Sequence, residues 1–139
     1  MTVTVDINIL LDVFQNREPH YTASAQLLTL IEAGTVIAVF PSHGLATLYY
    51  VVRKHGSKAS AEAAMDRVLD HFRIGDLDAA GWREARKLAL DDFEDAAVAA
   101  VARKSGSQYI ITRDADGFDA SPVPAISPTE FLAQTPDEL

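Results

Sequence analysis

The chain has 139 residues, with 12 basic and 20 acidic side chains and a formal charge of −8 at pH 7. Its length and its 48% apolar content predict a single domain over residues 1–139, of which about 134–139 form a polar tail. The acidic balance argues against binding nucleic acid by bulk attraction to phosphate, although divalent cations could offset an acidic site. The absence of cysteine excludes disulfides and a cysteine-based zinc site, and it fits a cytoplasmic location. Because no apolar run reaches about 18 residues, we expect neither a signal peptide nor a membrane span.

Hydrophobic patterning predicts strands that alternate with helices along the chain. Strands are expected at about 2–5, 36–40, 73–77, 109–112 and 123–126. Helices are expected at about 8–15, 20–32, 43–54, 59–72, 79–90, 91–104 and 128–133. This alternation predicts an α/β fold in which a mainly parallel sheet is covered by helices on both faces.

Local signals mark several element boundaries. Gly34 and Gly106 are placed to end helices, because glycine readily adopts the left-handed conformation that follows a helix. Ser42 is expected to cap the helix that begins at residue 43. Residues 127–130 combine a capping box with a proline at the first helical position, which predicts a short C-terminal helix.

Acidic side chains stand where two predicted strands end. Asp6 follows Val5, Asp114 follows shortly after Thr112, and an acidic run at 91–95 opens a helix. The carboxyl ends of parallel strands and the amino ends of the next helices share one edge of a sheet, so these segments could meet in one crevice. Carboxylates gathered there would repel one another without a cation, and oxygen ligands suit Mg²⁺ or Mn²⁺. Such an ion could support phosphodiester hydrolysis.

The acids that open the helix also have a structural interpretation. Asp92 is suited to cap the helix, and Glu94 and Asp95 in its first turn complement the helix dipole. Asp92 and Asp95 are three residues apart and could point the same way. Glu94 lies about 100° around the helix from Asp95, so we do not expect both to bind one ion.

The other acids have simple alternatives as well. Asp114 and Asp116 could be ordinary turn residues beside Gly117. Asp12, one turn after the start of the first helix, is predicted to lie on a solvent-exposed face. Asp6 is harder to explain by packing, because it joins a buried strand to an apolar helix.

Three stretches of the sequence resemble motifs of PIN-domain nucleases. The opening motif V-D-x-N-x-L-L-D is matched by Val5-Asp6-Ile7-Asn8-Ile9-Leu10-Leu11-Asp12. The family's D-x-x-D-A and I-I-T-R-D/N-x-x-x-F motifs are similar to Asp92–Ala96 and Tyr109–Phe118. The order and spacing agree over nearly the whole chain, and the nearest branch resembles VapC-type toxins of bacterial toxin–antitoxin pairs.

The resemblance implies a three-layer α/β/α sandwich and Mg²⁺- or Mn²⁺-dependent hydrolysis of RNA. The metal ligands that it implies are Asp6, Asp95 and Asp114, and the side chains that orient them are Asn8 and Thr112. Asp116 matches an acidic position that the family uses less regularly. The resemblance also implies a homodimer and a cognate antitoxin protein.

One position departs from the family pattern. The family usually has a glutamate early in the helix after the second strand, where this sequence has Thr47, and no acid occurs between Glu32 and Glu62. Either Asp92 or Glu94 compensates, or metal binding is weaker, or activity is lost.

Three hypotheses follow. The first is a ribonuclease in which Asp6, Asp95 and Asp114 hold one or two ions, assisted by Asp92 or Asp116. The second is a degenerate PIN scaffold that binds RNA or protein without catalysis. The third is a phosphatase of the haloacid-dehalogenase type, because residues 6–8 are loosely similar to its D-x-D motif, although Asn8 replaces the second acid.

Overall fold

A computed structural model of the chain describes residues 1–134. At its centre lies a five-stranded parallel sheet with the order β3-β2-β1-β4-β5. The strands are β1 (Thr2–Val5), β2 (Ile37–Pro41), β3 (Arg73–Gly75), β4 (Tyr109–Ile111) and β5 (Ala125–Ile126). The predicted parallel sheet is therefore confirmed, with the N-terminal strand in its middle. Apart from Gln134, the predicted polar tail lies outside the described residues.

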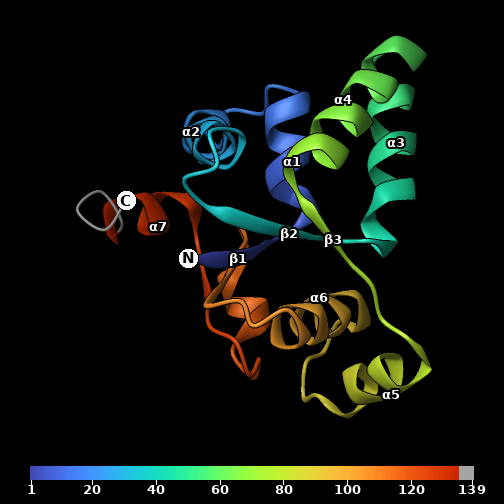
Figure 1. Cartoon of the computed structure of the whole chain (residues 1–139), viewed down its shortest axis with the longest axis vertical. Coiled ribbons are helices and arrows are strands. Elements are labelled where there is room, and N and C mark those ends of the chain that lie inside the picture. The colour runs from blue at the N-terminus through green and yellow to red at the C-terminus, as the bar shows by residue number, and fades with distance from the viewer. Residues whose placement is uncertain (135–139) are drawn as a thin grey trace.

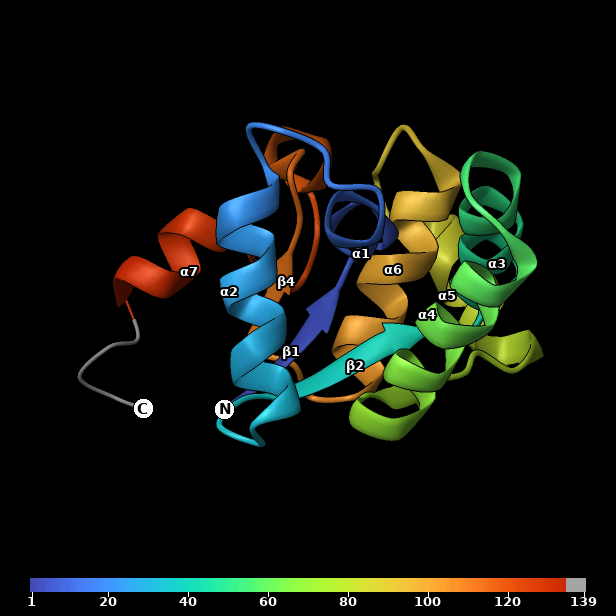
Figure 2. The same cartoon turned by 90° about the horizontal axis from the view of Figure 1, so that it is seen from above.

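Helices cover both faces of the sheet (Figure 1). One face carries α1 (Ile7–Phe14), α2 (Tyr21–Glu32), α3 (His43–His55) and α4 (Lys58–His71). The opposite face carries α5 (Ala79–Lys87) and α6 (Phe93–Lys104). A 3₁₀ turn, η1 (Ala115–Phe118), follows β4, and α7 (Pro128–Gln134) packs beside α2 (Figure 2). The expected three-layer α/β/α sandwich is confirmed.

Strand β1 anchors the sheet because its side chains are buried on both faces. Val3 and Val5 are completely buried, as expected for a central parallel strand rich in β-branched residues. Thr4 is also buried, and its hydroxyl shares a 2.8 Å hydrogen bond with the hydroxyl of Ser107. The backbone N–H of Asp6 donates to the carbonyl of Ile111 at 3.0 Å, so the chain leaves β1 beside the end of β4.

Helix α6 is apolar around most of its circumference. Every residue from Ala96 to Ala102 is buried, because the helix lies between the sheet and α5. Its small alanine side chains allow close approach to the sheet. The side chain of Asp92 accepts a 3.0 Å hydrogen bond from the N–H of Asp95 and so caps the helix as predicted. The capped end brings the acidic run to the same region as Asp6.

Most predicted boundary signals are confirmed. Gly34 and Gly106 follow helices with positive φ angles of 78° and 69°. Ser127 and Glu130 form the reciprocal bonds of a capping box. The prediction for Ser42 is wrong: its backbone is already helical, and its side chain makes no capping hydrogen bond within residues 1–134.

Differences in element length are small. Helix α5 ends at Lys87 rather than near residue 90, and β5 begins at Ala125 rather than at residue 123. None of the helices in the described part of the chain combines the length and apolarity needed to cross a membrane.

The prediction that Asp12 is solvent-exposed is wrong. The residue is fully buried, with the Nε of Arg113 3.3 Å from its Oδ2. Helix α1 contacts α2 on one side and α3 on another, so little of its circumference faces solvent. The helical period of α1 alone does not reveal that the face that carries Asp12 is covered by the rest of the fold.

Candidate functional site

The carboxylate of Asp6 is held rigidly where β1 ends and α1 begins. It is only 6% exposed. Its Oδ1 accepts a 2.8 Å hydrogen bond from the backbone N–H of Ile7 and so caps α1. Its Oδ2 accepts a 2.9 Å hydrogen bond from the hydroxyl of Thr112, which follows β4. Two adjacent strands therefore fix the position of one acid.

Asn8 links this acid to the next one. Its amide nitrogen lies 3.4 Å from Asp6 Oδ2 and 3.5 Å from Asp114 Oδ2. Its Oδ1 accepts from the N–H of Arg113 at 3.4 Å, which fixes the amide orientation. The N–H of Asp114 also donates to Thr112 Oγ1 at 3.2 Å. Asn8 and Thr112 therefore lie where they can orient both carboxylates.

Asp95, in the first turn of α6, lies near Asp6 and Asp114. A Cβ atom added to Gly117 would lie 3.2 Å from Asp95 Oδ2, so this carboxylate rests against η1. Burial and then nearby negative charges raise the pKa of Asp95 from 3.8 to about 6. In order of effect, those charges belong to Asp6, Asp92, Glu94 and Asp114. The fold thus gathers the acids that the sequence predicted would meet.

The pKa of Asp6 is also raised. Burial is the main cause, and the negative charges of Glu94 and Asp114 add to it. The hydrogen bonds from Thr112 and from the N–H of Ile7 act in the opposite direction. Because burial outweighs these bonds, the ionised form of Asp6 lacks a sufficient compensating charge within the described chain.

The remaining acids lie on two sides of this centre. Asp92, Asp95 and Asp116 line a cavity of about 250 Å³ between the start of α6 and η1. Asp6 and Glu94 line a separate, much smaller hollow together with His43. Glu94 and Asp95 therefore face different hollows, in keeping with their separation around the helix.

Thr47 does not join the acids through any side-chain hydrogen bond in residues 1–134, and it lies on an exposed part of α3. The sequence named Glu94 as one residue that could compensate for it. The structure places Glu94 beside Asp6, where it supplies negative charge from α6 instead of α3.

Sequence reasoning missed two features around the site. One is the buried contact between Asp12 and Arg113, the residue directly before Asp114. The other is the position of His43 beside Asp6 and Glu94, where burial lowers the pKa of the imidazole. His43 lies far from both acids and from Trp82 in the sequence, so only the folded structure reveals its neighbours.

The donor atoms fit a hard divalent cation in their chemistry. They are carboxylate oxygens, and the pKa of Asp95 is raised first by burial and then by neighbouring negative charges, an effect that a bound cation would oppose. Within residues 1–134, however, no three His, Cys, Asp or Glu side chains are already arranged to hold a metal ion. The amide of Asn8 instead stands between Asp6 and Asp114. Small side-chain rotations would therefore accompany binding.

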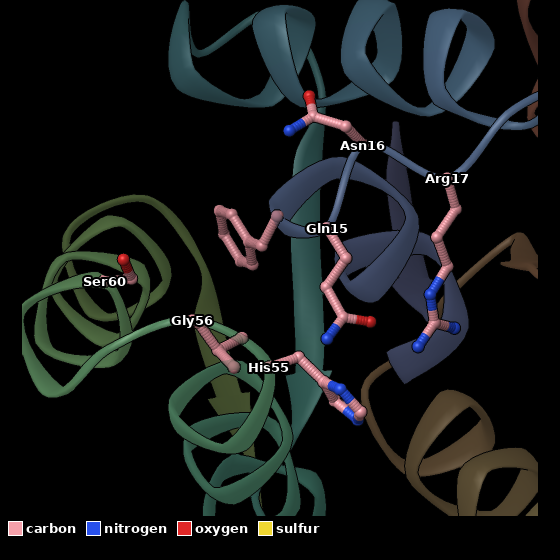
Figure 3. A pocket seen from close by; sticks show the side chains of 8 residues that line it. Gln15, Asn16, Arg17, His55, Gly56 and Ser60 are labelled. Carbon is pink, nitrogen blue, oxygen red and sulfur yellow. The ribbon is translucent and has the colours of Figure 1, made fainter.

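A larger cavity lies elsewhere. It has a volume of about 500 Å³ and is lined by the end of α1 and the α3–α4 connection, including Arg17 and His55 (Figure 3). Its lining belongs to the far end of α1 from Asp6. This cavity is therefore separate from the acidic region.

Solved structures of bacterial toxin–antitoxin proteins share this fold. VapBC2 of Rickettsia felis, solved with a DNA fragment from its promoter, has a TM-score of 0.70 and 19% identity, covering 91% of this chain and 98% of that chain. FitAcB of Neisseria gonorrhoeae has a TM-score of 0.65 and 19% identity over 91% and 98% of the two chains. VapC20 of Mycobacterium tuberculosis is described as a sarcin–ricin loop cleaving toxin. It has a TM-score of 0.63 and 18% identity, covering 78% of this chain and 86% of that chain.

These identities are low, so the likeness to solved structures establishes the fold alone. A search of curated proteins finds no match. A family model described as the PIN domain matches residues 2–116, which include Asp6, Asp95 and Asp114. This match covers most of the chain, and the protein therefore belongs to the PIN domain family.

Proposed function

We propose that this protein is a Mg²⁺- or Mn²⁺-dependent endoribonuclease and the toxin of a toxin–antitoxin pair. One observation carries the proposal: three acids from separate segments, Asp6, Asp95 and Asp114, converge where β1 and β4 end. Burial, and after it the negative charges of neighbouring acids, raises the pKa of Asp95 to about 6. A cluster of ionised carboxylates destabilises the fold unless a cation binds to it, and clusters of this kind are typical of functional sites.

The three acids would hold the ion, and Asp92 or Asp116 would assist from the cavity that they share with Asp95. When bound, the ion would lower the pKa of a water molecule and offset charge on the phosphodiester. Thr112 and Asn8 help to orient the carboxylates of Asp6 and Asp114 through hydrogen bonds. Burial of Asp6 keeps bulk water away from this carboxylate.

The toxin assignment rests on the PIN family match and on the solved VapBC and FitAB assemblies that share the fold. It implies a small antitoxin protein as partner, RNA as substrate, a homodimer and a cytoplasmic location. The neighbouring gene provides a simple check, because it should encode a short protein with a DNA-binding N-terminus.

Asp6→Asn tests the catalytic assignment. Asparagine keeps an oxygen that can accept from the N–H of Ile7, so we expect the fold to persist. Cleavage of a mixed-sequence single-stranded RNA with Mn²⁺ should fall by at least about 100-fold, since losing even an outer partner of a metal site costs 10- to 100-fold. EDTA should abolish cleavage by the parent protein.

The matched control is Asp66→Asn, which changes an exposed aspartate on α4. It should cleave as the parent does. If Asp6→Asn cleaved RNA as fast as this control, the assignment of the site would be wrong.

A second candidate function is a PIN scaffold that binds RNA or protein without catalysis. Two observations favour it: Thr47 replaces the usual glutamate, and residues 1–134 hold no preformed group of three metal ligands. Calorimetric titration separates the two functions. Heat of binding with Mn²⁺ that disappears in Asp6→Asn supports the nuclease, and absence of binding at millimolar Mn²⁺ supports the scaffold.

A further inference from the structure

Beside the acids, the ring of Trp82 contacts two further aromatic rings, so that three helices contribute one ring each. The ring centroids of His43 in α3 and Trp82 in α5 are 5.5 Å apart in an edge-to-face arrangement. The centroids of Trp82 and Phe93, the first residue of α6, are 5.8 Å apart with a tilt of 38°. We call these three residues the aromatic cluster.

The aromatic cluster directly adjoins the candidate site. His43 lines the small hollow that also contains Asp6 and Glu94. Phe93 immediately precedes Glu94 and follows the capping residue Asp92. A chain lying across the acids would therefore pass close to these rings.

Core packing does not explain the exposure of these rings. Phe93 is 50% exposed at the helix start, although large apolar side chains are favoured in the interior. His43 and Trp82 are half-buried, so they support Phe93 while leaving part of the cluster open to solvent. The arrangement resembles a surface on which a flat group can lie, rather than an enclosed pocket.

Charged side chains of both signs lie near the cluster: Asp92 and Glu94 flank Phe93 in the sequence, and arginines lie near Trp82. Arg86 is exposed and lies one helical turn after Trp82, on the same face of α5. Arg83, next to Trp82, is exposed as well. Guanidinium groups beside aromatic rings provide phosphate contacts next to stacking surfaces, the combination that single-stranded nucleic acids require.

We propose that His43, Trp82 and Phe93 form a stacking platform for a base of single-stranded RNA, adjacent to the phosphodiester that the acids attack. The inference rests on the proposed function for the identity of the ligand, and it adds a substrate subsite to it. Stacking accepts every base, so the platform favours unpaired RNA without reading its sequence. Arg86 would contact the backbone of the stacked nucleotide.

The only tryptophan of the chain is part of the platform, so its fluorescence reports on the site. The probe is a mixed-sequence 12-nucleotide RNA, titrated into Asp6→Asn protein with Mg²⁺ so that the RNA stays intact. We expect quenching by this RNA and little quenching by an abasic oligomer of equal length and charge. Equal quenching by the RNA and by the abasic oligomer would show that binding depends on phosphate alone, and it would overturn the proposal of a stacking platform.

Phe93→Ala, made in the same background, tests the cluster directly. Loss of one base–aromatic stack should weaken RNA binding by about tenfold or more. The matched control is Tyr50→Ala, because Tyr50 is a 63% exposed aromatic on α3 whose ring contacts Lys54 instead. Equal affinity of Phe93→Ala and this control would overturn the proposal.

Two further outcomes separate the possible failures. If fluorescence changes with protein concentration in the absence of RNA, and Phe93→Ala shifts the oligomeric state, the cluster is an interface between copies of the chain. If parent protein cleaves RNA but Phe93→Ala binds it normally, the platform fails while the nuclease stands. If RNA quenches Trp82 but the parent never cleaves it, the nuclease fails while the platform stands.

Discussion

At the scale of single residues, the contact between Asp12 and Arg113 connects α1 to the turn that carries Asp114. Asp12 is completely buried, and the side chain of Arg113 is 29% exposed. Burial is the largest effect on the pKa of Asp12 and raises it, whereas the charge of Arg113 lowers it. Since Arg113 directly precedes Asp114, this pair holds the turn that places a candidate metal ligand.

Asp12→Asn tests whether the charge of Asp12 is a net benefit to the fold. Burial disfavours the ionised carboxylate and outweighs the attraction of Arg113, whose guanidinium is partly exposed. At pH 7.5 the neutral amide should therefore leave the free energy of unfolding unchanged or raise it slightly. Urea denaturation measures the difference, with Asp66→Asn on α4 as the exposed control. A loss of about 3 kcal/mol in Asp12→Asn alone would show that the ion pair outweighs the cost of burial.

Asp95 makes the stability of the metal-free protein depend on pH. Its pKa rises from 3.8 to about 6 on folding. Between these values the folded protein retains a proton that the unfolded chain has released, so the free energy of unfolding falls as pH rises through this window. Below about pH 4 the carboxyl is protonated in both states and the penalty disappears.

Asp95→Asn should remove this dependence. In EDTA at pH 7.5, we expect the variant to exceed the parent by about 1–2 kcal/mol in unfolding free energy, a value reduced for the partial exposure of the group. At pH 4 the two proteins should be nearly equal. Denaturation curves at both pH values provide the measurement, and a constant difference between them would contradict a titrating Asp95.

At the scale of elements, local rules predicted most of the fold. Central strands were recognisable from β-branched runs, and helix ends from Gly34, Gly106 and the capping box at 127–130. Each of these signals acts within a few residues, so the sequence carries it directly. The meeting of Asp6, Asp95 and Asp114 was also predictable, because parallel topology brings strand ends and helix starts to one edge.

The features that could not be predicted depend on contacts between distant elements. The burial of Asp12 follows from the neighbours of α1, and the ring contacts of Trp82 follow from how α5 meets α3 and α6. A helical period shows which residues share a face, but it does not show how many faces will be covered. The same limit explains why the sequence does not show that the apolar side chain of Phe93 is half-exposed.

At the scale of the whole molecule, the site depends on close packing between the sheet and α6. Gly75 ends β3 at the carboxyl edge of the sheet, opposite Pro41 of β2. A Cβ atom on Gly75 would lie 2.5 Å from Cγ1 of Val101 and 2.8 Å from Cγ1 of Val39. Both valines are buried, so neither can move into solvent. The absence of a side chain here therefore lets α6 sit close to the sheet.

Gly75→Ala should separate these layers slightly and destabilise the protein. Overpacking of this kind costs about 1–3 kcal/mol of unfolding free energy. Val101→Ala alone should also destabilise, because it leaves a cavity. In the double variant the new methyl group occupies space that the side chain of Val101 leaves. The decrease in unfolding free energy of the double variant should therefore be smaller than the sum of the decreases in the two single variants. Urea denaturation of all four proteins measures this coupling, and simple additivity would show that β3 and α6 are not in the tight contact described.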